Sequence, residues 1–487
     1  MHQAATRRAV LGGAAGAFVA GASLLAGCSV GQAATSAAAP PPNNNPQPTP
    51  ANTQTTIVFY AKPPNASANA NTIIRIMQEV LAPYYQTHKG VYVHLIPQEL
   101  PTSQIVSSIL AGEQMDIIYD NYFAPYSQQS LVVPLRSYFE RDAVDPAIWN
   151  SAQYALYNTP AGPMGVPVYT GTSALAINQG MFDQAGLPYP SPTWSHQDFA
   201  AACRALAHPG GKKPIYGGTL FWYKSGPSQQ ASWAFKAFGG NQVSPSGAPS
   251  QLSSPPNLAA LDWLYQDLFW PQICVPQDAA GWTQFVQGQC AMVDMDTWNL
   301  LGFAEALHGP SVKFDFLPYP VFPAGRTTFC TADFYAIAAN CKHVDAAWDL
   351  LRWVSVEPAW QRATFAYSLR SPALNSLWDE WATTIQQVVP FFKGKDFHWF
   401  GDAAAKGYAY PVEYYPYADQ HVWGIIAPYF SNLYARQSTV AGTAQAIDQV
   451  VNAYEASAQQ MQTAQTAASS AFPAAGGQTI AVVPPGL

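Results

Sequence analysis

Two hydrophobic periodicities alternate between residues 56 and 120, and this alternation constrains the fold more than any other feature of the chain. Short runs of β-branched and aromatic residues predict buried strands at residues 56–60, 91–97 and 115–119. Apolar residues at helical spacing predict two intervening helices, over 73–84 and from 105 to a stop at Gly112. This βαβαβ order predicts an α/β fold with a mostly parallel sheet and helices on its faces.

The ends of these strands carry the first candidate site residues. Ligands of open parallel sheets bind beyond the carboxyl ends of the strands. Tyr60 ends the first predicted strand, and Asp120 and Asn121 follow the third. We therefore predict that these three residues line a ligand site.

The N-terminus has the layout of an export signal. Arg7 and Arg8 precede an uncharged apolar stretch, which ends in small residues directly before Cys28. The LLAGC sequence resembles the bacterial lipobox, whose cysteine receives lipid and becomes the first mature residue. Twin-arginine and plain secretory signals both fit. A transmembrane anchor is the alternative, but the stretch is short for a bilayer and rich in Gly and Ala. We predict a signal peptide at 1–27 and an extracytoplasmic protein anchored to the membrane through lipidated Cys28.

Two segments have compositions that cannot build a core. Residues 28–54 are dominated by Ala, Pro, Asn, Gln and Thr, which predicts a disordered linker behind the anchor. Residues 464–487 form a second low-complexity segment, predicted to be a poorly structured tail. The length of the remaining chain suggests two domains.

Charge and cysteine content exclude several classes of protein. The formal net charge is −7 and becomes −9 once Arg7 and Arg8 are removed, which argues against nucleic acid as a partner. With Cys28 lipidated, five cysteines remain, so at least one is unpaired within the chain. A disulfide between Cys274 and Cys290 is sterically possible, but we expect most of the cysteines to be buried thiols. The spacings match no zinc pattern, and we predict no metal or cofactor.

Catalytic motifs are missing from the sequence. There is no G-x-S-x-G elbow, no H-E-x-x-H, no phosphate-binding G-x-x-x-x-G-K-[ST] and no G-x-G-x-x-G after the first strand. A glycosidase's pair of carboxylates would be invisible in a single sequence, and Glu413 is the one candidate for such a role. We predict that the protein is not an enzyme.

Four segments, in order, resemble the extracellular solute-binding proteins of family 1, the sugar-type binding proteins of ABC importers. They are LAGEQMDIIYDN, MGVPVYTGTSALAINQGMFDQAGLPYPSPTWSHQDF, FVQGQCAMVDMDTW and VDAAWDLLRWVSVEPAWQ. The resemblance covers roughly residues 55–460. The chain departs from the family at Met115, where proline is usual, and before Arg370, where serine replaces proline.

The resemblance implies a two-lobed periplasmic-binding-protein-like fold (type II) with the ligand cleft between the lobes. Lobe 1 is expected to comprise residues 55–169 and 331–370, and lobe 2 residues 170–330 and 371–463. The chain is expected to cross between the lobes near residues 168–170, near residues 331–333 and near Arg370.

The resemblance also implies further ligand-binding residues. Sugars combine apolar faces with hydroxyl edges, so their sites use stacking rings and charged hydrogen-bonding groups. Trp298 follows the "AM" strand, where the family often places a ring that stacks on sugar. The other candidates lie at expected crossings, at the strand end before Trp298, or near a "GG" loop of the second lobe: Tyr169, Trp222, Trp233, Asp296, Asp333 and Arg370.

We therefore expect a monomeric lipoprotein that captures a carbohydrate and delivers it to the permease subunits of an ABC transporter. A polyamine or a phosphorylated small molecule is the alternative ligand. The cations Lys62, Lys224, Lys236 and Arg370 look too few and too scattered in sequence to bind phosphate. A ligand sensor and a secreted carbohydrate-active enzyme are the remaining alternatives.

Overall fold

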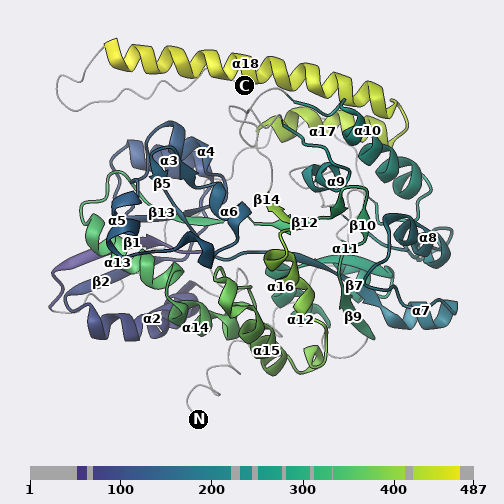
Figure 1. Cartoon of the computed structure of the whole chain (residues 1–487), viewed down its shortest axis with the longest axis horizontal. Coiled ribbons are helices and arrows are strands. Elements are labelled where there is room, and N and C mark those ends of the chain that lie inside the picture. The colour runs from purple at the N-terminus through teal and green to yellow at the C-terminus, as the bar shows by residue number, and fades with distance from the viewer. Residues whose placement is uncertain are drawn as a thin grey trace.

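Two α/β lobes lie side by side in the computed structural model of the chain (Figure 1). The structure describes residues 52–62, 70–220, 231–243, 250–276, 281–307, 312–331, 333–411 and 421–471. The predicted signal peptide, Cys28, Trp222, Lys224 and Glu413 lie outside these residues.

The first lobe contains the predicted parallel sheet, extended by two strands from elsewhere in the chain. Its order is β2-β1-β3-β13-β6. The strands β1 (Thr55–Tyr60), β2 (Val91–Ile96) and β3 (Ile117–Asp120) are parallel, which confirms the predicted order of elements. The strand β13 (Phe334–Ile337) is antiparallel to both β3 and β6 (Val166–Pro167).

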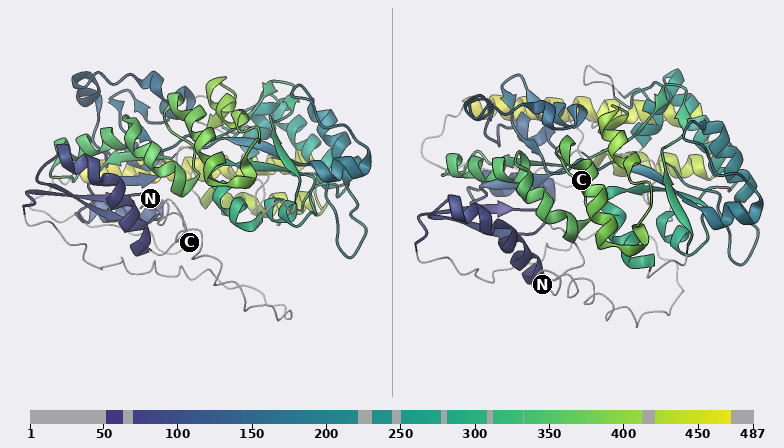
Figure 2. Two further views of the ribbon diagram at one scale, coloured as in Figure 1. Left: turned by 90° about the horizontal axis from the view of Figure 1, so that it is seen from below. Right: turned by 60° about the horizontal axis from the view of Figure 1, so that its bottom comes forward.

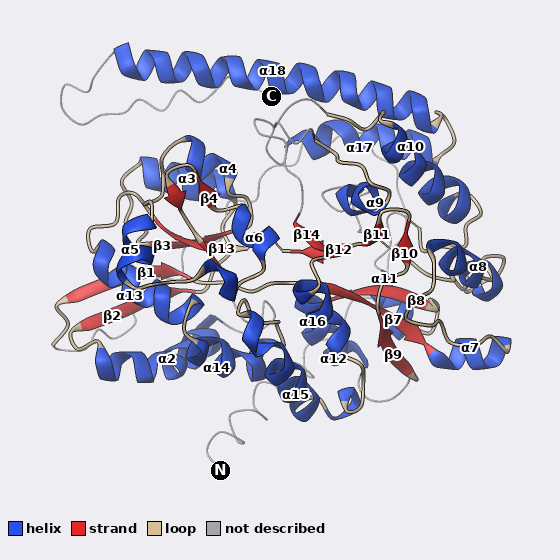
Figure 3. Ribbon diagram, viewed as in Figure 1, coloured by secondary structure: helices blue, strands red, loops and turns tan. Residues whose placement is uncertain are grey.

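Helices flank this sheet (Figure 3). The two predicted helices are α2 (Ala70–Thr87) and α3 (Thr102–Leu110), and two more come from the second half of the chain, α13 (Val344–Ser355) and α14 (Pro358–Ser368). Ile57 and Phe59 of β1 are fully buried between the layers. Shorter elements complete the lobe: α4 (Ala124–Gln128), α5 (Arg136–Arg141), α6 (Ser151–Ala155), β4 (Asn158–Thr159) and β5 (Gly162–Pro163).

The second lobe is built on an antiparallel sheet of order β8-β7-β9. Its strands are β7 (Ser173–Asn178), β8 (Met292–Asp296) and β9 (Phe314–Leu317). Ser195 caps α8 in a reciprocal capping box with Asp198. The other elements are α7 (Gln179–Ala185), α8 (His196–Leu206), α9 (Ala231–Ala237), α10 (Pro255–Asp262), α11 (Gly281–Val286), α12 (Leu300–Leu307), β10 (Val321–Phe322) and β11 (Gly325–Arg326).

Three chain segments join the lobes, and we call them the crossing segments. The first, residues 168–172, links β6 to β7, and the second, residues 331–333, links β12 (Thr328–Cys330) to β13. The Thr331 amide donates to the Gly171 carbonyl at 2.9 Å. The third, residues 369–372, follows α14, and the Ser371 hydroxyl donates to the Thr170 carbonyl at 2.9 Å.

The last part of the chain lies over the joint and on the second lobe. Figure 2 shows α14, α15 (Trp378–Val388) and α16 (His398–Ala405) in green across the middle of the molecule. The strand β14 (Ala409–Pro411) pairs with β12. The helix α17 (His421–Tyr434) packs against α18 (Val440–Ala471).

One expectation from the sequence is wrong. The helix α18 continues to Ala471, past the predicted start of the tail at residue 464, because its Ala- and Gln-rich sequence favours helix. Cys274 and Cys290 are free, buried thiols, as the sequence favoured over a disulfide, and they pair with Gly218 and Tyr216 of the segment 216–219. Among the described residues, no helix is both long enough and apolar enough to cross a bilayer.

The first prediction concerns Gly171. A Cβ atom there would lie 2.4 Å from Cγ2 of Thr331 and 2.9 Å from Cε3 of Trp298. Thr331 cannot rotate away freely, because its hydroxyl bonds the Gly171 amide and the Tyr169 carbonyl. We expect Gly171→Ala to lower the free energy of unfolding by about 1–3 kcal/mol in denaturant titration.

The matched control is Gly302→Ala in α12, where an added Cβ meets nothing within 4 Å. Alanine is the better helix former there, so we expect no loss of stability. Equal effects of the two substitutions would show that Gly171 is not sterically required.

Candidate ligand-binding site at the joint between the lobes

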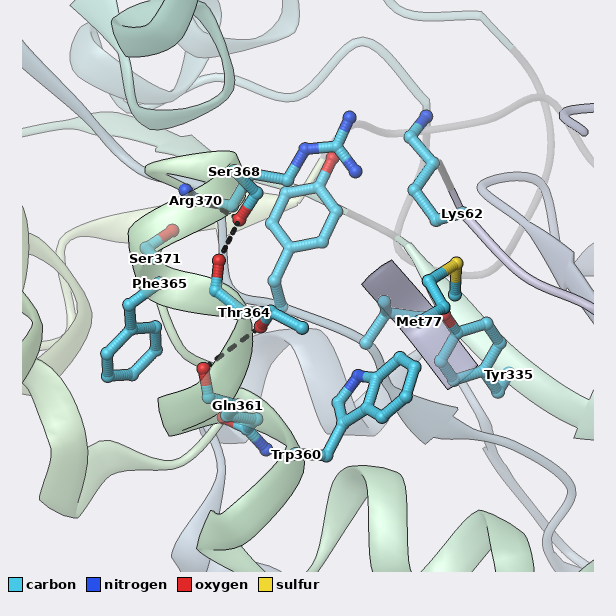
Figure 4. A pocket seen from close by; sticks show the side chains of 12 residues that line it. Lys62, Met77, Tyr335, Trp360, Gln361, Thr364, Phe365, Ser368, Arg370 and Ser371 are labelled. Atoms are coloured by element: carbon cyan, nitrogen blue, oxygen red, sulfur yellow. Dashed lines mark hydrogen bonds between the residues drawn. The ribbon is translucent and has the colours of Figure 1, made fainter. Parts of the chain in front are cut away.

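A small cavity lies where the crossing segments meet the first sheet, and we call it the joint cavity (Figure 4). Lys62 follows β1, Tyr335 lies on β13, and Trp360 is the first residue of α14 that lines the cavity. Tyr169 and Arg370 come from two crossing segments. Met77, Val168, Gln361, Thr364, Phe365, Ser368 and Ser371 complete the lining.

Asp333 lies beneath this cavity and is only 4% exposed. Its carboxylate accepts a hydrogen bond from the Tyr119 hydroxyl, and the Tyr169 hydroxyl interacts with the same carboxylate. Burial, followed by the charge of Asp333, raises the pKa of both phenols well above the ordinary value. Both tyrosines therefore stay protonated at neutral pH and act as donors.

Two cations lie over the rings of these tyrosines. The Lys62 ammonium is 4.5 Å from the Tyr119 ring centre, and the Arg370 guanidinium is 5.3 Å from that of Tyr169. Lys62 also forms an ion pair of 2.6 Å with Glu99, which follows β2. Lys62 and Arg370 are far apart in sequence, but the fold brings them to one cavity.

The second lobe contributes a set of aromatic side chains, which we call the aromatic wall: Trp233, Trp298, Phe329 and Tyr410. Trp298 is half-buried and contacts the crossing segment at Gly171. Phe329 packs edge-on against Trp298 and Trp233, with ring centres 5.0 and 4.1 Å apart. Trp233 is 3% exposed and belongs to the core of the lobe, whereas Trp298 presents part of its ring. Tyr410 lies opposite Phe329 in the β12–β14 pair.

The residues predicted from the strand ends β1 and β3 do not line the joint cavity. The Asp120 carboxylate accepts hydrogen bonds from the Tyr126 hydroxyl and from the amides of Asn121 and Tyr122, so it shapes the loop after β3. Burial raises the pKa of Asp120 to about 6, although these hydrogen bonds oppose the shift. Tyr60 is half-buried against the small core that contains Ile105.

Asp296 is also buried, at the end of β8. It accepts hydrogen bonds from the Ser173 hydroxyl and, at 3.1 Å, from the side-chain amide of Asn299. Burial raises the pKa of Asp296 to about 7. Burial, followed by the charge of Asp296, raises the pKa of neighbouring Asp294 as well. Two acids on one strand therefore share a poorly solvated environment beside the first crossing segment.

Several residues of the site could not be selected from the sequence. Tyr119, Tyr335 and Trp360 stand in patterns typical of core strands and helices. Lys62 had a usable signal, because it follows β1 at the same sheet edge as Tyr60. Among the described residues, no three His, Cys, Asp or Glu side chains are grouped as metal ligands would be.

Comparison with known proteins gives consistent results. Residues 69–359 match the family described as bacterial extracellular solute-binding protein. A binding protein of Brucella abortus (strain 2308) is 23% identical over 301 residues, covering 56% of this chain and 67% of its own length.

Two solved structures share the fold. The sugar-binding protein MalE from Xanthomonas citri superposes with a TM-score of 0.67 at 17% identity, over 83% of this chain and 98% of its own. UgpB from Mycobacterium tuberculosis, in complex with glycerophosphocholine, gives 0.64 at 17% identity, over 85% and 99% of the two chains. These neighbours establish the two-lobed α/β architecture.

The second prediction concerns the pH dependence of stability at Asp296. Its pKa is raised on folding, so the folded state binds more protons than the unfolded state between about pH 4 and pH 7. Its favourable contribution is therefore complete below about pH 4 and is lost as pH rises through about 7. We expect Asp296→Asn to gain at least about 1 kcal/mol of stability relative to the parent protein between pH 5 and pH 8, measured by denaturant titration.

Asp198→Asn is the control, because hydrogen bonds from Ser195 lower the pKa of Asp198. Its difference from the parent protein should stay constant over the same pH range. A constant difference for Asp296→Asn as well would contradict the prediction.

Proposed function

Because the chain belongs to the bacterial extracellular solute-binding proteins, we propose that it captures a carbohydrate outside the cytoplasm and delivers it to the permease of an ABC importer. The observation that carries this proposal is the joint cavity with its two cations, Lys62 and Arg370, each of which lies over a tyrosine ring.

The chemistry of these groups suits a ligand with many hydroxyls. Arg370 forms no ion pair within the described residues, so its N–H groups are available to hydroxyl oxygens. Trp298 is a half-buried ring of the aromatic wall, and we propose that the C–H groups of a sugar pack on it. The neighbour from Xanthomonas citri is a sugar-binding protein, which supports the same class of ligand.

A phosphorylated small molecule is the second candidate, because UgpB of the same fold holds glycerophosphocholine. The charges around the joint cavity do not favour it. Lys62 is paired with Glu99, and Arg370 lies one ring away from the carboxylate of Asp333. The four formal charges cancel, so the cavity provides no excess of positive charge for a phosphate.

Binding is proposed to proceed by closure of the lobes about the crossing segments. Lys62 belongs to the first lobe and Trp298 to the second, while Arg370 stands on the third crossing segment. A ligand that contacts all three stabilises the closed arrangement by its differential affinity for that state. No covalent bond is made or broken in this process, so the protein is proposed to act without catalysis. We also propose that it acts as a monomer.

The first lobe and the N-terminus suggest how the protein is held outside the cell. The described chain begins at residue 52, and the Gln54 amide donates to the Gly90 carbonyl at 2.8 Å, at the edge of the first sheet. We propose that the preceding linker leads from this edge to a lipid on Cys28. The lipobox-like sequence before Cys28 supports this arrangement.

The third prediction tests the ligand and the aromatic wall together. A thermal-shift screen should find oligosaccharides that raise the melting temperature of the protein by mass action. For the best of them, Trp298→Ala should weaken binding by at least about tenfold in isothermal titration, because a stacking face is lost.

The matched control is Trp270→Ala. Trp270 is also half-buried, but it lies beside Arg436 and Leu433 and does not belong to the aromatic wall. It should retain the parent affinity. Stabilisation by glycerophosphocholine and by no carbohydrate would favour the second candidate.

The fourth prediction concerns anchoring. Cys28→Ser removes the thiol that would carry lipid, so the protein should move from the membrane fraction to the soluble fraction of the expressing bacterium. Its ligand-free melting temperature should not change, because Cys28 precedes the first strand, β1 (Thr55–Tyr60), by a long linker-like sequence. Retention of the variant in the membrane fraction would refute the lipid anchor.

A further inference from the structure

One buried carboxylate is connected to both cations of the joint cavity through two aromatic rings. The Asp333 carboxylate accepts a hydrogen bond from Tyr119 and interacts with the Tyr169 hydroxyl, and Lys62 and Arg370 lie over these two rings. Figure 4 shows the side chains of Lys62 and Arg370 extending toward the same end of the cavity. The five residues come from separate parts of the chain, so their meeting is a product of the fold.

We propose that Asp333 is a positioning residue for ligand binding: it fixes the two tyrosine rings that hold Lys62 and Arg370 in place, and it does not itself contact the ligand. This inference rests on the proposed function. It reassigns Asp333 from the ligand contact expected from the sequence to a group that acts through its neighbours.

The burial of Asp333 supports the statement that it does not contact the ligand. Its side chain is covered by the two tyrosines, and its backbone carbonyl accepts hydrogen bonds from Gln153 at 3.2 Å and from Tyr157 at 3.1 Å. A residue held at both its side chain and its backbone cannot turn toward a ligand without breaking several buried hydrogen bonds.

The contacts of Asp333 with the phenols of Tyr119 and Tyr169 support the statement that it fixes their rings. Each phenol has a single proton, and donating it to Asp333 fixes the direction of the ring. Donation to an anion also makes the ring richer in electrons, which strengthens its attraction for a cation above its face. Lys62 and Arg370 are thereby held over Tyr119 and Tyr169 before any ligand arrives. Pre-orientation of long side chains lowers the entropy cost of binding.

The net effect is a specificity for a ligand that presents acceptor oxygens to two fixed donors at once. Glu99 and Asp333 balance the two positive charges, so hydroxyl and ether oxygens suit the pair better than an anion does. A carbohydrate offers such oxygens on neighbouring carbon atoms.

The test is a double-mutant cycle on carbohydrate affinity. Asp333→Asn keeps the shape and one acceptor but removes the charge, and we expect about a tenfold weaker affinity in isothermal titration. If Asp333 acts through Arg370, adding Asp333→Asn to Arg370→Gln should weaken binding by no more than about threefold further. Adding it to Trp298→Ala, on the other lobe, should multiply the two losses. Parent-like affinity of Asp333→Asn, or multiplied losses with Arg370→Gln, would overturn the proposal.

Two further measurements test the positioning role even if Asp333→Asn folds poorly or no carbohydrate binds. Tyr169→Phe removes the hydroxyl that interacts with Asp333 and leaves the charge of Asp333, so it should reproduce the coupling to Arg370 even if Asp333→Asn folds poorly. Crystal structures of the ligand-free parent and Asp333→Asn proteins should show the guanidinium leaving the Tyr169 ring only in the variant. An unmoved guanidinium would refute the positioning role even if no carbohydrate bound, so this outcome is separate from failure of the proposed function.

Discussion

The architecture depends on the buried hydrogen bonds that hold the crossing segments together. These segments leave one sheet for another, so their backbone groups lack a continuous ladder and need other partners. The side-chain amide of Gln153 donates to two of them, the carbonyls of Tyr169 and Asp333. Its side-chain carbonyl also accepts a hydrogen bond from the Thr170 hydroxyl at 2.7 Å. Gln153 is completely buried, so an unmade bond there would cost the full desolvation of the group.

The same network divides the joint into two halves. Up to Thr170 the first crossing segment is tied to Gln153 of the first lobe, whereas Thr172 donates its hydroxyl to the Phe400 carbonyl on α16 at 2.8 Å. Gly171 stands between the two anchors, and Thr331 contacts it from the second crossing segment. We infer that the backbone bends near Gly171 when the angle between the lobes changes. The part of the joint cavity that the first lobe forms would then move with that lobe, and Trp298 would move with the second.

Local patterns in the sequence predicted the features that depend on neighbouring residues. The strand β1 and the helix α2 follow from hydrophobic periodicity within one segment. The insertion of β13 between β3 and β6 joins residues more than 160 positions apart, and no local pattern specifies it. The joint cavity depends on that insertion, since Asp333 and Tyr335 flank Phe334 on the incoming strand. This is why the candidate aromatics and charges could be collected from the sequence, while the link from Asp333 through Tyr119 to Lys62 could not.

The chain stabilises its buried acids near the joint in different ways, and the difference separates binding from scaffolding. Asp120 is surrounded by amide and hydroxyl donors that belong to its own loop, so it stabilises local structure. Asp296 has two side-chain donors and no ion pair within the described residues, and its pKa rises to about 7. Asp333 alone has donors that themselves carry cations at the edge of a cavity. A buried charge of this kind influences a ligand without touching it, because the rings between them transmit both orientation and electron density to Lys62 and Arg370.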